Sequence, residues 1–209
     1  MTTAPEASRW RAGPRRLAQL MVGLVLFGVG EALVVLSDLG SSPWIALSQG
    51  AAVQTPLGVG VATVAISFIV LLAWFPLHQR PGLGTILNAI VVGLAIDATL
   101  TLLPGGSPLG VRLAELVGGI ALVGVGSGYY LSAALGPGPR DGLMTGLVRR
   151  TGGSVRVVRT CIEVVVVMTG WLLGGTLGLA TVLFVVSIGP LVHWFLPRLH
   201  VHSHRDPTS

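Results

Sequence analysis

The sequence predicts an all-α polytopic membrane protein with six transmembrane helices, arranged as two inverted three-span repeats. Each repeat is also expected to contain one short helix that is re-entrant or interfacial. Composition, apolar runs and an internal duplication lead to this prediction. Of the 209 residues, 52% are hydrophobic and 10% are charged, whereas an average soluble domain has about 25% charged residues. So few charges cannot cover a soluble fold, and so much apolar content excludes disorder.

Six apolar runs of about 17 residues or more are each long enough to cross a hydrocarbon core of about 30 Å as a helix. They are Leu17–Leu36, Val59–Leu77, Thr85–Leu103, Leu113–Leu135, Val157–Leu173 and Leu179–Leu196. Two further stretches, Pro43–Gln54 and Pro139–Arg150, follow the first and fourth runs. Each would be only about 18 Å long as a helix. They are therefore predicted to be re-entrant or interfacial helices.

The chain aligns with itself without a gap when Arg16 is placed on Arg112, and close to a third of the aligned positions are then identical. RLAQL at Arg16 meets RLAEL at Arg112 in this alignment. The predicted repeats cover residues 16–111 and 112–198, between tails at 1–15 and 199–209. With three crossings in each repeat, the second repeat must enter the membrane in the opposite orientation, as in many transporter folds.

Arginines set the predicted orientation, because basic residues near span ends favour the cytoplasmic side. If the N-terminus is cytoplasmic, every arginine except Arg112 lies inside. If the two short helices also crossed, Arg80 and Arg140 would move outside, which favours six spans. The lysine-free, Ala/Gly/Val/Arg-rich composition suggests a bacterium with a GC-rich genome. We therefore expect a multi-pass protein of the bacterial cytoplasmic membrane with both termini cytoplasmic.

Small residues and tryptophans describe how the spans pack. Gly28-x-x-x-Ala32 and Gly124-x-x-x-Gly128 are repeat equivalents, and such spacing lets helix backbones approach closely. They predict that the first and fourth spans cross near the axis relating the repeats. All tryptophans lie at or near predicted span ends, where rings favour the headgroup layer. These are Trp10, Trp44, Trp74, Trp171 and Trp194.

Two proline-glycine loops, LGSSPW and LGPGPRDG, each precede a short helix. Pro43 and Pro139 are suited to the first turns of these helices. A half-helix presents unpaired N–H groups and partial positive charge at its N-terminus, which can face an anionic group near the membrane midplane. Arg140 would strengthen this preference, and Asp141 could cap the helix. The alternative is a sharp turn into an interfacial helix whose terminal arginines touch lipid phosphates.

Ionisable residues within apolar spans are functional candidates, because burying a charge in lipid is costly. Glu31 and Asp97 have no local partner in the sequence and rank highest. Asn88 and His193 add polar groups to the third and sixth spans. Asp97 and His193 are repeat equivalents, so they could face one shared cavity and there carry protons or bind a cation.

Other reactive groups support no catalytic or metal site. Glu163 follows Arg159 by one helical turn, which predicts an ion pair. The single cysteine, Cys161, excludes an intramolecular disulfide framework and a cysteine-based zinc cluster. The histidines at 200, 202 and 204 lie in a tail without a carboxylate partner, so no metal is expected there. Because HExxH and GxSxG motifs are also missing, we predict neither an enzyme nor a bound cofactor.

At the proline-glycine loops the chain resembles the YczE family of bacterial integral membrane proteins, within the YitT-like group. The matching motifs are LGPGPRDGLMTGL from Leu135, SVRVVRTCIE from Ser154, GTILN from Gly84 and SIGP from Ser187. The likeness runs from about Arg16 to Pro197. It implies a small multi-span protein and supplies no substrate or catalytic residue. Ile45 stands where the resemblance leads us to expect an acid mirroring Asp141.

Two functional hypotheses follow. The leading one is a small transporter-like protein with its pathway between the repeats, motivated by the odd-span duplication and the unpaired Glu31 and Asp97. The alternative is a non-transporting scaffold or assembly factor that binds a partner protein or lipid, motivated by the glycine-rich packing faces. The expected partners are the lipid bilayer and a small solute or a partner protein; homo-oligomerisation is left open, and nucleic acid is not expected.

Overall fold

The structure is a computed structural model that describes residues 7–199, and all regular structure within that range is helical. The helices are α1 (Ala7–Trp10), α2 (Pro14–Leu36), α3 (Pro43–Gln54), α4 (Val59–Ala73), α5 (Leu83–Leu102), α6 (Leu109–Ser132), α7 (Pro139–Thr151), α8 (Val155–Leu172) and α9 (Leu179–Leu199). The first of the two short helices, α3, has the predicted bounds. The histidine tract at 200–204 and most of the two predicted tails lie outside the described residues.

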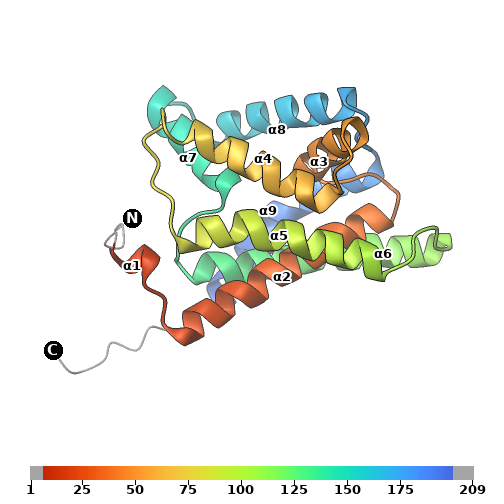
Figure 1. Cartoon of the computed structure of the whole chain (residues 1–209), viewed down its shortest axis with the longest axis horizontal. Helices are drawn as coiled ribbons and strands as arrows, with labels where there is room; N and C mark the ends of the chain where they lie inside the picture. The colour runs from red at the N-terminus through yellow and green to blue at the C-terminus, as the bar shows by residue number, and fades with distance from the viewer. Residues whose placement is uncertain (1–6, 200–209) are drawn as a thin grey trace.

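The helices form two groups that lie side by side (Figure 1). In one group α2 packs along both α5 and α6, and α6 also packs along α9. The other group contains α3, α4, α7 and α8, in which α3 contacts α4 and α8, and α7 contacts the same two helices. Contact between α4 and α5 joins the groups. Helices α2 to α5 thus recur in order as α6 to α9.

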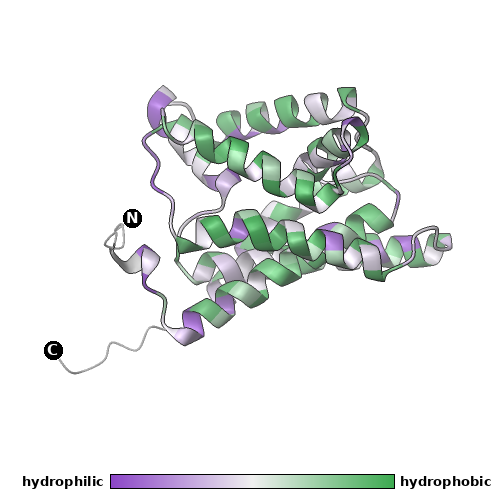
Figure 2. Cartoon of the chain, viewed as in Figure 1, coloured by the Kyte–Doolittle hydropathy of each residue, from purple (hydrophilic) through white to green (hydrophobic). Residues whose placement is uncertain are grey.

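Four helices are long and apolar enough to cross a membrane: α2, α5, α6 and α9. A fifth span results if α3 and α4, which meet at 111°, are counted as one. The predicted second span ends early because α4 has only 15 residues, and Pro76 follows it. The predicted fifth span, α8, contains Arg156, Arg159 and Glu163. The helices are nevertheless predominantly apolar (Figure 2), so the chain is a multi-pass membrane protein, and the number six stays a prediction.

Glycines allow α2 and α6 to cross in close contact, as predicted for the first and fourth spans. A Cβ at Gly30 would lie 2.7 Å from the Gly119 carbonyl oxygen, and a Cβ at Gly119 would lie 2.7 Å from the Gly30 oxygen. Gly23 and Gly126 make a similar close contact about two helical turns away. The glycines named in the prediction have another role: Gly28 packs on α5, and its equivalent Gly124 packs on α9.

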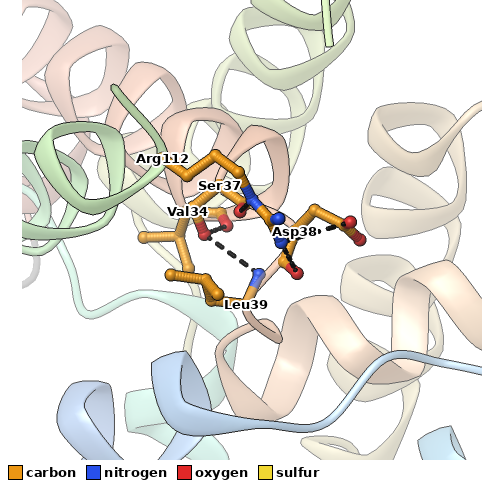
Figure 3. A network of polar contacts seen from close by, with 5 residues as sticks. All are labelled: Val34, Ser37, Asp38, Leu39 and Arg112. Atoms are coloured by element: carbon orange, nitrogen blue, oxygen red, sulfur yellow. Dashed lines mark hydrogen bonds and ion pairs between the residues drawn. The ribbon is translucent and has the colours of Figure 1, made fainter. Parts of the chain in front are cut away.

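The two halves exchange equivalent hydrogen bonds. The Arg16 guanidinium donates to the carbonyl oxygens of Ala133 and Ala134 at the end of α6, at 2.9 to 3.1 Å. Its repeat equivalent, Arg112, donates to the carbonyl oxygens of Ser37 and Asp38 at the end of α2, at 2.6 Å each (Figure 3). Each half therefore binds the end of the other half's first long helix.

The loops after α2 and α6 are fixed in the same reciprocal way. The Gly84 N–H donates to the Leu135 oxygen at 2.8 Å, and the Ala180 N–H donates to the Leu39 oxygen at 2.9 Å. The loop glycines that follow these oxygens have φ of +108° and +118°, a region that favours glycine. These contacts direct each chain from a long helix into a short one, α3 or α7.

Candidate functional site

A cavity of about 380 Å³ lies between the two halves of the chain. Several of its walls are repeat-equivalent pairs, including Glu31 with Ser127 and Trp44 with Arg140. The volume is at the lower end of the range for small-molecule sites, roughly 300–1,000 Å³. The cavity therefore lies at the boundary between the two predicted repeats and is large enough for a small molecule.

Both short helices begin at this cavity. Ser42 and Gly138 are their N-caps, and both residues line it. Within the described chain, no side chain caps the first turn of either helix. Helix N-termini carry partial positive charge and free N–H donors. The two half-helices thus give one cavity two anion-attracting ends, which is the arrangement that the proline-glycine loops predicted.

Trp74 holds the start of α7 in place. Its indole N–H donates to the Pro139 carbonyl oxygen at 3.0 Å, and its ring packs on Gly142. The side chain is only 2% exposed. Trp74 lies at the end of α4, as predicted, but it packs inside the protein because the glycine on α7 makes room for its ring.

Glu31 is the most unusual group in the cavity wall. It is 1% exposed, and neither of its carboxylate oxygens has a hydrogen-bond partner among the described residues. The Ser42 hydroxyl is buried beside this carboxylate in the same wall. A buried charge without a partner is strongly unfavourable. Such a group is a functional-site candidate, because a ligand or ion could supply the missing contact.

Arg140 faces the same space. Its guanidinium carbon lies 5.0 Å from the centroid of the Trp44 ring, a cation–π geometry. The positive charge interacts with the carboxylates of Glu31 and Asp141. Glu31 and Arg140 thus lie within electrostatic reach, although no described hydrogen bond joins them. A polar group of a ligand could occupy the gap.

Asp141 does not cap its own helix, contrary to the prediction. Its carboxylate accepts a hydrogen bond of 2.6 Å from the Tyr130 hydroxyl, which comes from the end of α6. Asn88 lies beside this pair, since a Cβ at Gly138 would be 3.2 Å from the Asp141 carboxylate and 3.5 Å from the Asn88 amide. Tyr130, Asp141 and Asn88 form a hydrogen-bonding wall next to the start of α7.

The cavity reaches the protein surface between α8 and α9. The predicted ion pair between Arg159 and Glu163 is present at 2.9 Å, and both residues line the cavity. Arg159 and His193, which faces the cavity from α9, are exposed. The rim thus carries one closed ion pair and one imidazole.

The opening is present in one half of the chain only, because the equivalent helix pairs of the two halves pack differently. In the first half α4 packs along α5, and a Cβ at Gly93 would lie 2.5 Å from both the Gly60 oxygen and a Val64 methyl carbon. The equivalent helices α8 and α9 do not pack extensively within the described residues. A Cβ at Gly189, the equivalent of Gly93, would meet no other described atom within 4 Å. One helix pair is closed, and its counterpart is open.

Asp97 closes the α4–α5 pair and does not line the cavity. Its carboxylate accepts hydrogen bonds from the backbone N–H groups of Gly60, at 2.7 Å, and Val61, at 2.9 Å. The prediction that Asp97 and His193 face one cavity is therefore wrong. These two N–H groups at the start of α4 are unpaired helix donors, and they fix Asp97 outside the cavity. Its equivalent His193 lies at the open rim.

Similar proteins place this architecture in a family. The profile of a family of unknown function, DUF6198, matches residues 14–197. A Bacillus subtilis protein called "Uncharacterized membrane protein YczE" is 32% identical over 178 residues, covering 84% of this chain and 83% of its own. The chain therefore belongs to the DUF6198 family, and it is a relative of YczE. An uncharacterized Haemophilus influenzae protein is 45% identical over 195 residues, covering 93% and 89% of the two chains. No solved structure matches.

The resemblance to the YczE family is thus confirmed, and the structure shows where the predicted site residues of this YczE-like protein lie. All except Pro139 and Asp97 line the cavity: Glu31, Pro43, Asn88, Arg140, Asp141 and His193. Their part in a solute pathway stays a prediction. The sequence analysis did not identify Tyr130 and Trp44 as residues of the cavity wall. Their positions next to the proline-glycine loops could have indicated it.

Proposed function

We propose that this YczE-family protein is a small transporter that moves an unmodified solute through the cavity between its two halves. The observation that carries the proposal is a difference between two equivalent helix pairs. Helix α4 packs closely against α5, whereas α8 is separated from α9. Alternating access needs two states of one protein around a fixed site. If the halves exchange these conformations, the same cavity opens on the opposite side.

The proposal includes the six-span inverted arrangement in the cytoplasmic membrane, with both termini inside. In this orientation the open pair exposes Arg159 and His193 to the cytoplasm, which makes the present conformation inward-open. The closed pair, held by Asp97, lies at the outer side. The exchanged hydrogen bonds of Arg16 and Arg112 support a two-fold relation between the halves, because only reciprocal placement lets each clamp the other.

Glu31 and the two helix N-termini would form the fixed part of the site. Glu31 lies on α2, in the α2–α6 crossing whose glycines bring the two helix backbones into close contact. The helices that differ between the halves, α4, α5, α8 and α9, surround this crossing. A rigid centre with movable flanks is the arrangement that alternating access requires.

The test is two-sided access to the cavity. Cys161 is replaced by Ser, and single cysteines are introduced as Ser127→Cys and Ser67→Cys, since both serines are buried and line the cavity. A membrane-impermeant thiol reagent is applied to intact cells and to inverted vesicles. Thr99→Cys is the matched control, because Thr99 is 8% exposed but lies outside the cavity wall.

We expect both cavity cysteines to react from both faces, faster from the cytoplasmic face, while the control stays unreactive. Reaction from one face alone, or from neither, would overturn the transporter proposal. A fixed, one-sided cavity would instead fit the alternative, a scaffold or assembly factor that binds a partner protein or lipid.

A further inference from the structure

We infer that the cavity binds a small zwitterion of the amino-acid type, with an ammonium group at Glu31 and a carboxylate at Arg140 and the N-terminus of α7. This inference names the solute class for the proposed transporter and rests on that proposal. Its starting observation is that a carboxylate, Glu31, and a guanidinium, Arg140, line one cavity, and that the carboxylate is buried without a hydrogen-bond partner among the described residues.

The cationic end is assigned to Glu31. This carboxylate is 1% exposed, lines the cavity and has neither oxygen paired among the described residues. The buried hydroxyl of Ser42, beside Glu31 in the same wall, adds a further acceptor. An ammonium group has three donors and no acceptor, so these oxygens match it. The other carboxylates of the wall are already engaged, Asp141 by Tyr130 and Glu163 by Arg159.

The anionic end is assigned to Arg140 and the first turn of α7. The Arg140 side chain stacks on Trp44, and this stacking leaves the guanidinium edge, with its fork of donors, available to a carboxylate. No side chain within the described residues caps the first turn of α7, so its N–H groups add donors directed at the same place.

The two ends together exclude ligands with a single charge. An anion alone would leave Glu31 buried and unpaired, and a cation alone would meet Arg140 and two positive helix ends. A molecule with both charges a few bonds apart would satisfy both groups. Phe27, Val123, Phe184 and Ile188 supply an apolar remainder of the wall, which suits an uncharged side chain, and about 380 Å³ suits a small molecule.

The experiment measures ligand stabilisation of the full-length protein in lipid nanodiscs. Thermal unfolding is followed against increasing L-alanine, L-valine or L-leucine. Each is compared with the amine that lacks its carboxylate (ethylamine, isobutylamine, isopentylamine) and with the acid that lacks its amine (propionate, 3-methylbutanoate, 4-methylpentanoate). Ligands that bind the native state raise the melting temperature by mass action, so each series yields an apparent Kd.

At least one amino acid is expected to bind about tenfold or more tightly than either of its analogues, because each analogue leaves a charged group unpaired. Glu31→Gln should abolish the preference over the acid, and Arg140→Gln should abolish the preference over the amine. Glu163→Gln, which alters a paired carboxylate of the same cavity, should retain both preferences. Analogues that bind wild-type protein as well as the amino acids do, or no amino acid binding at all, would overturn the inference.

The outcome can be separated from that of the proposed function. Cysteines that react from both faces in a protein that binds no amino acid would leave the transporter standing and remove the zwitterion. Amino acid binding in a protein whose cysteines react from one face would remove the transporter and leave a zwitterion receptor site.

Discussion

Arg16 and Arg112 occupy equivalent positions in the two halves, and each donates hydrogen bonds to the backbone carbonyls that end the other half's first long helix. The last carbonyls of a helix have no partner within it and carry partial negative charge, so a guanidinium satisfies and neutralises them. Arg112 is also the one arginine that the predicted orientation places outside. Its structural role explains why an arginine stands there.

The hydrogen bonds that Arg16 and Arg112 donate to the opposite half, here called the clamp, predict that loss of either arginine lowers stability to a similar extent. Arg16→Gln and Arg112→Gln should each lower the free energy of unfolding by about 1.5–3 kcal/mol, the usual value of hydrogen bonds to a charged group. Arg156→Gln, at an exposed position of α8, should change it little. Melting temperatures in one detergent measure all three, and equal melting of the clamp variants and the control would refute the clamp.

The α2–α6 crossing predicts a sharp difference between neighbouring glycines. A Cβ at Gly119 would lie 2.7 Å from the Gly30 oxygen, whereas a Cβ at Gly118 would meet no described atom within 4 Å. Gly119→Ala should therefore cost more than the roughly 1–3 kcal/mol typical of overpacking and reduce the yield of folded protein. Gly118→Ala should be neutral or slightly stabilising. Size-exclusion profiles and melting curves distinguish them, and a well-folded Gly119→Ala protein would contradict the close crossing.

Much of this fold was predictable from local patterns. Proline at the first turn and glycine before it gave the bounds of α3, and the span-like runs gave α2, α5, α6 and α9. A carboxylate within an apolar run identified Glu31 as a site candidate. These signals are contained in a few consecutive residues, so one sequence suffices to detect them.

Features that depend on tertiary contacts were not predictable. Asp97 looked unpaired because its partners, the N–H groups of Gly60 and Val61, belong to another helix. The packing of the Trp74 ring inside the protein was not foreseen, because the glycine that accommodates it, Gly142, is far along the chain. The different packing of α4–α5 and α8–α9 cannot be predicted from a repeat, because similar sequences predict similar halves.

The Glu31 carboxylate is expected to lower the stability of the folded protein and to be required for transport. Glu31→Gln removes a buried carboxylate that has no hydrogen-bond partner among the described residues, so it is expected to raise the free energy of unfolding by on the order of 1 kcal/mol while abolishing any transport activity. Glu163→Gln removes a half-exposed i,i+4 ion pair, typically about 0.3–0.5 kcal/mol, and should lower stability only slightly. Melting curves and flux on the same preparations provide both readouts. Unchanged flux in Glu31→Gln would remove this residue from the mechanism.

Asp97 is expected to act as a latch on the closed side. Asp97→Asn weakens the two hydrogen bonds that tie α5 to the start of α4, so Ser127→Cys should become more reactive from the outside by several-fold. Thr101→Val is the control, because its hydroxyl bonds only to a carbonyl of its own helix. Outside reactivity that rises equally in both variants, or in neither, would show that Asp97 does not hold this side closed.

The most direct test of the central claim asks whether the open helix pair can close. Thr160 and Gly189 are the equivalents of Val64 and Gly93, which touch in the closed pair. In a Cys161→Ser background, Thr160→Cys with Gly189→Cys should form a disulfide under mild oxidation in membranes, because exchange of conformations brings these Cβ atoms within bonding distance. Thr160→Cys with Leu183→Cys, an exposed position of α9 outside the cavity wall, should not. A crosslink that also blocks cytoplasmic labelling of Ser127→Cys is the result that alternating access predicts. No crosslink between 160 and 189 would mean that the two halves keep their difference, and the transporter account would be wrong.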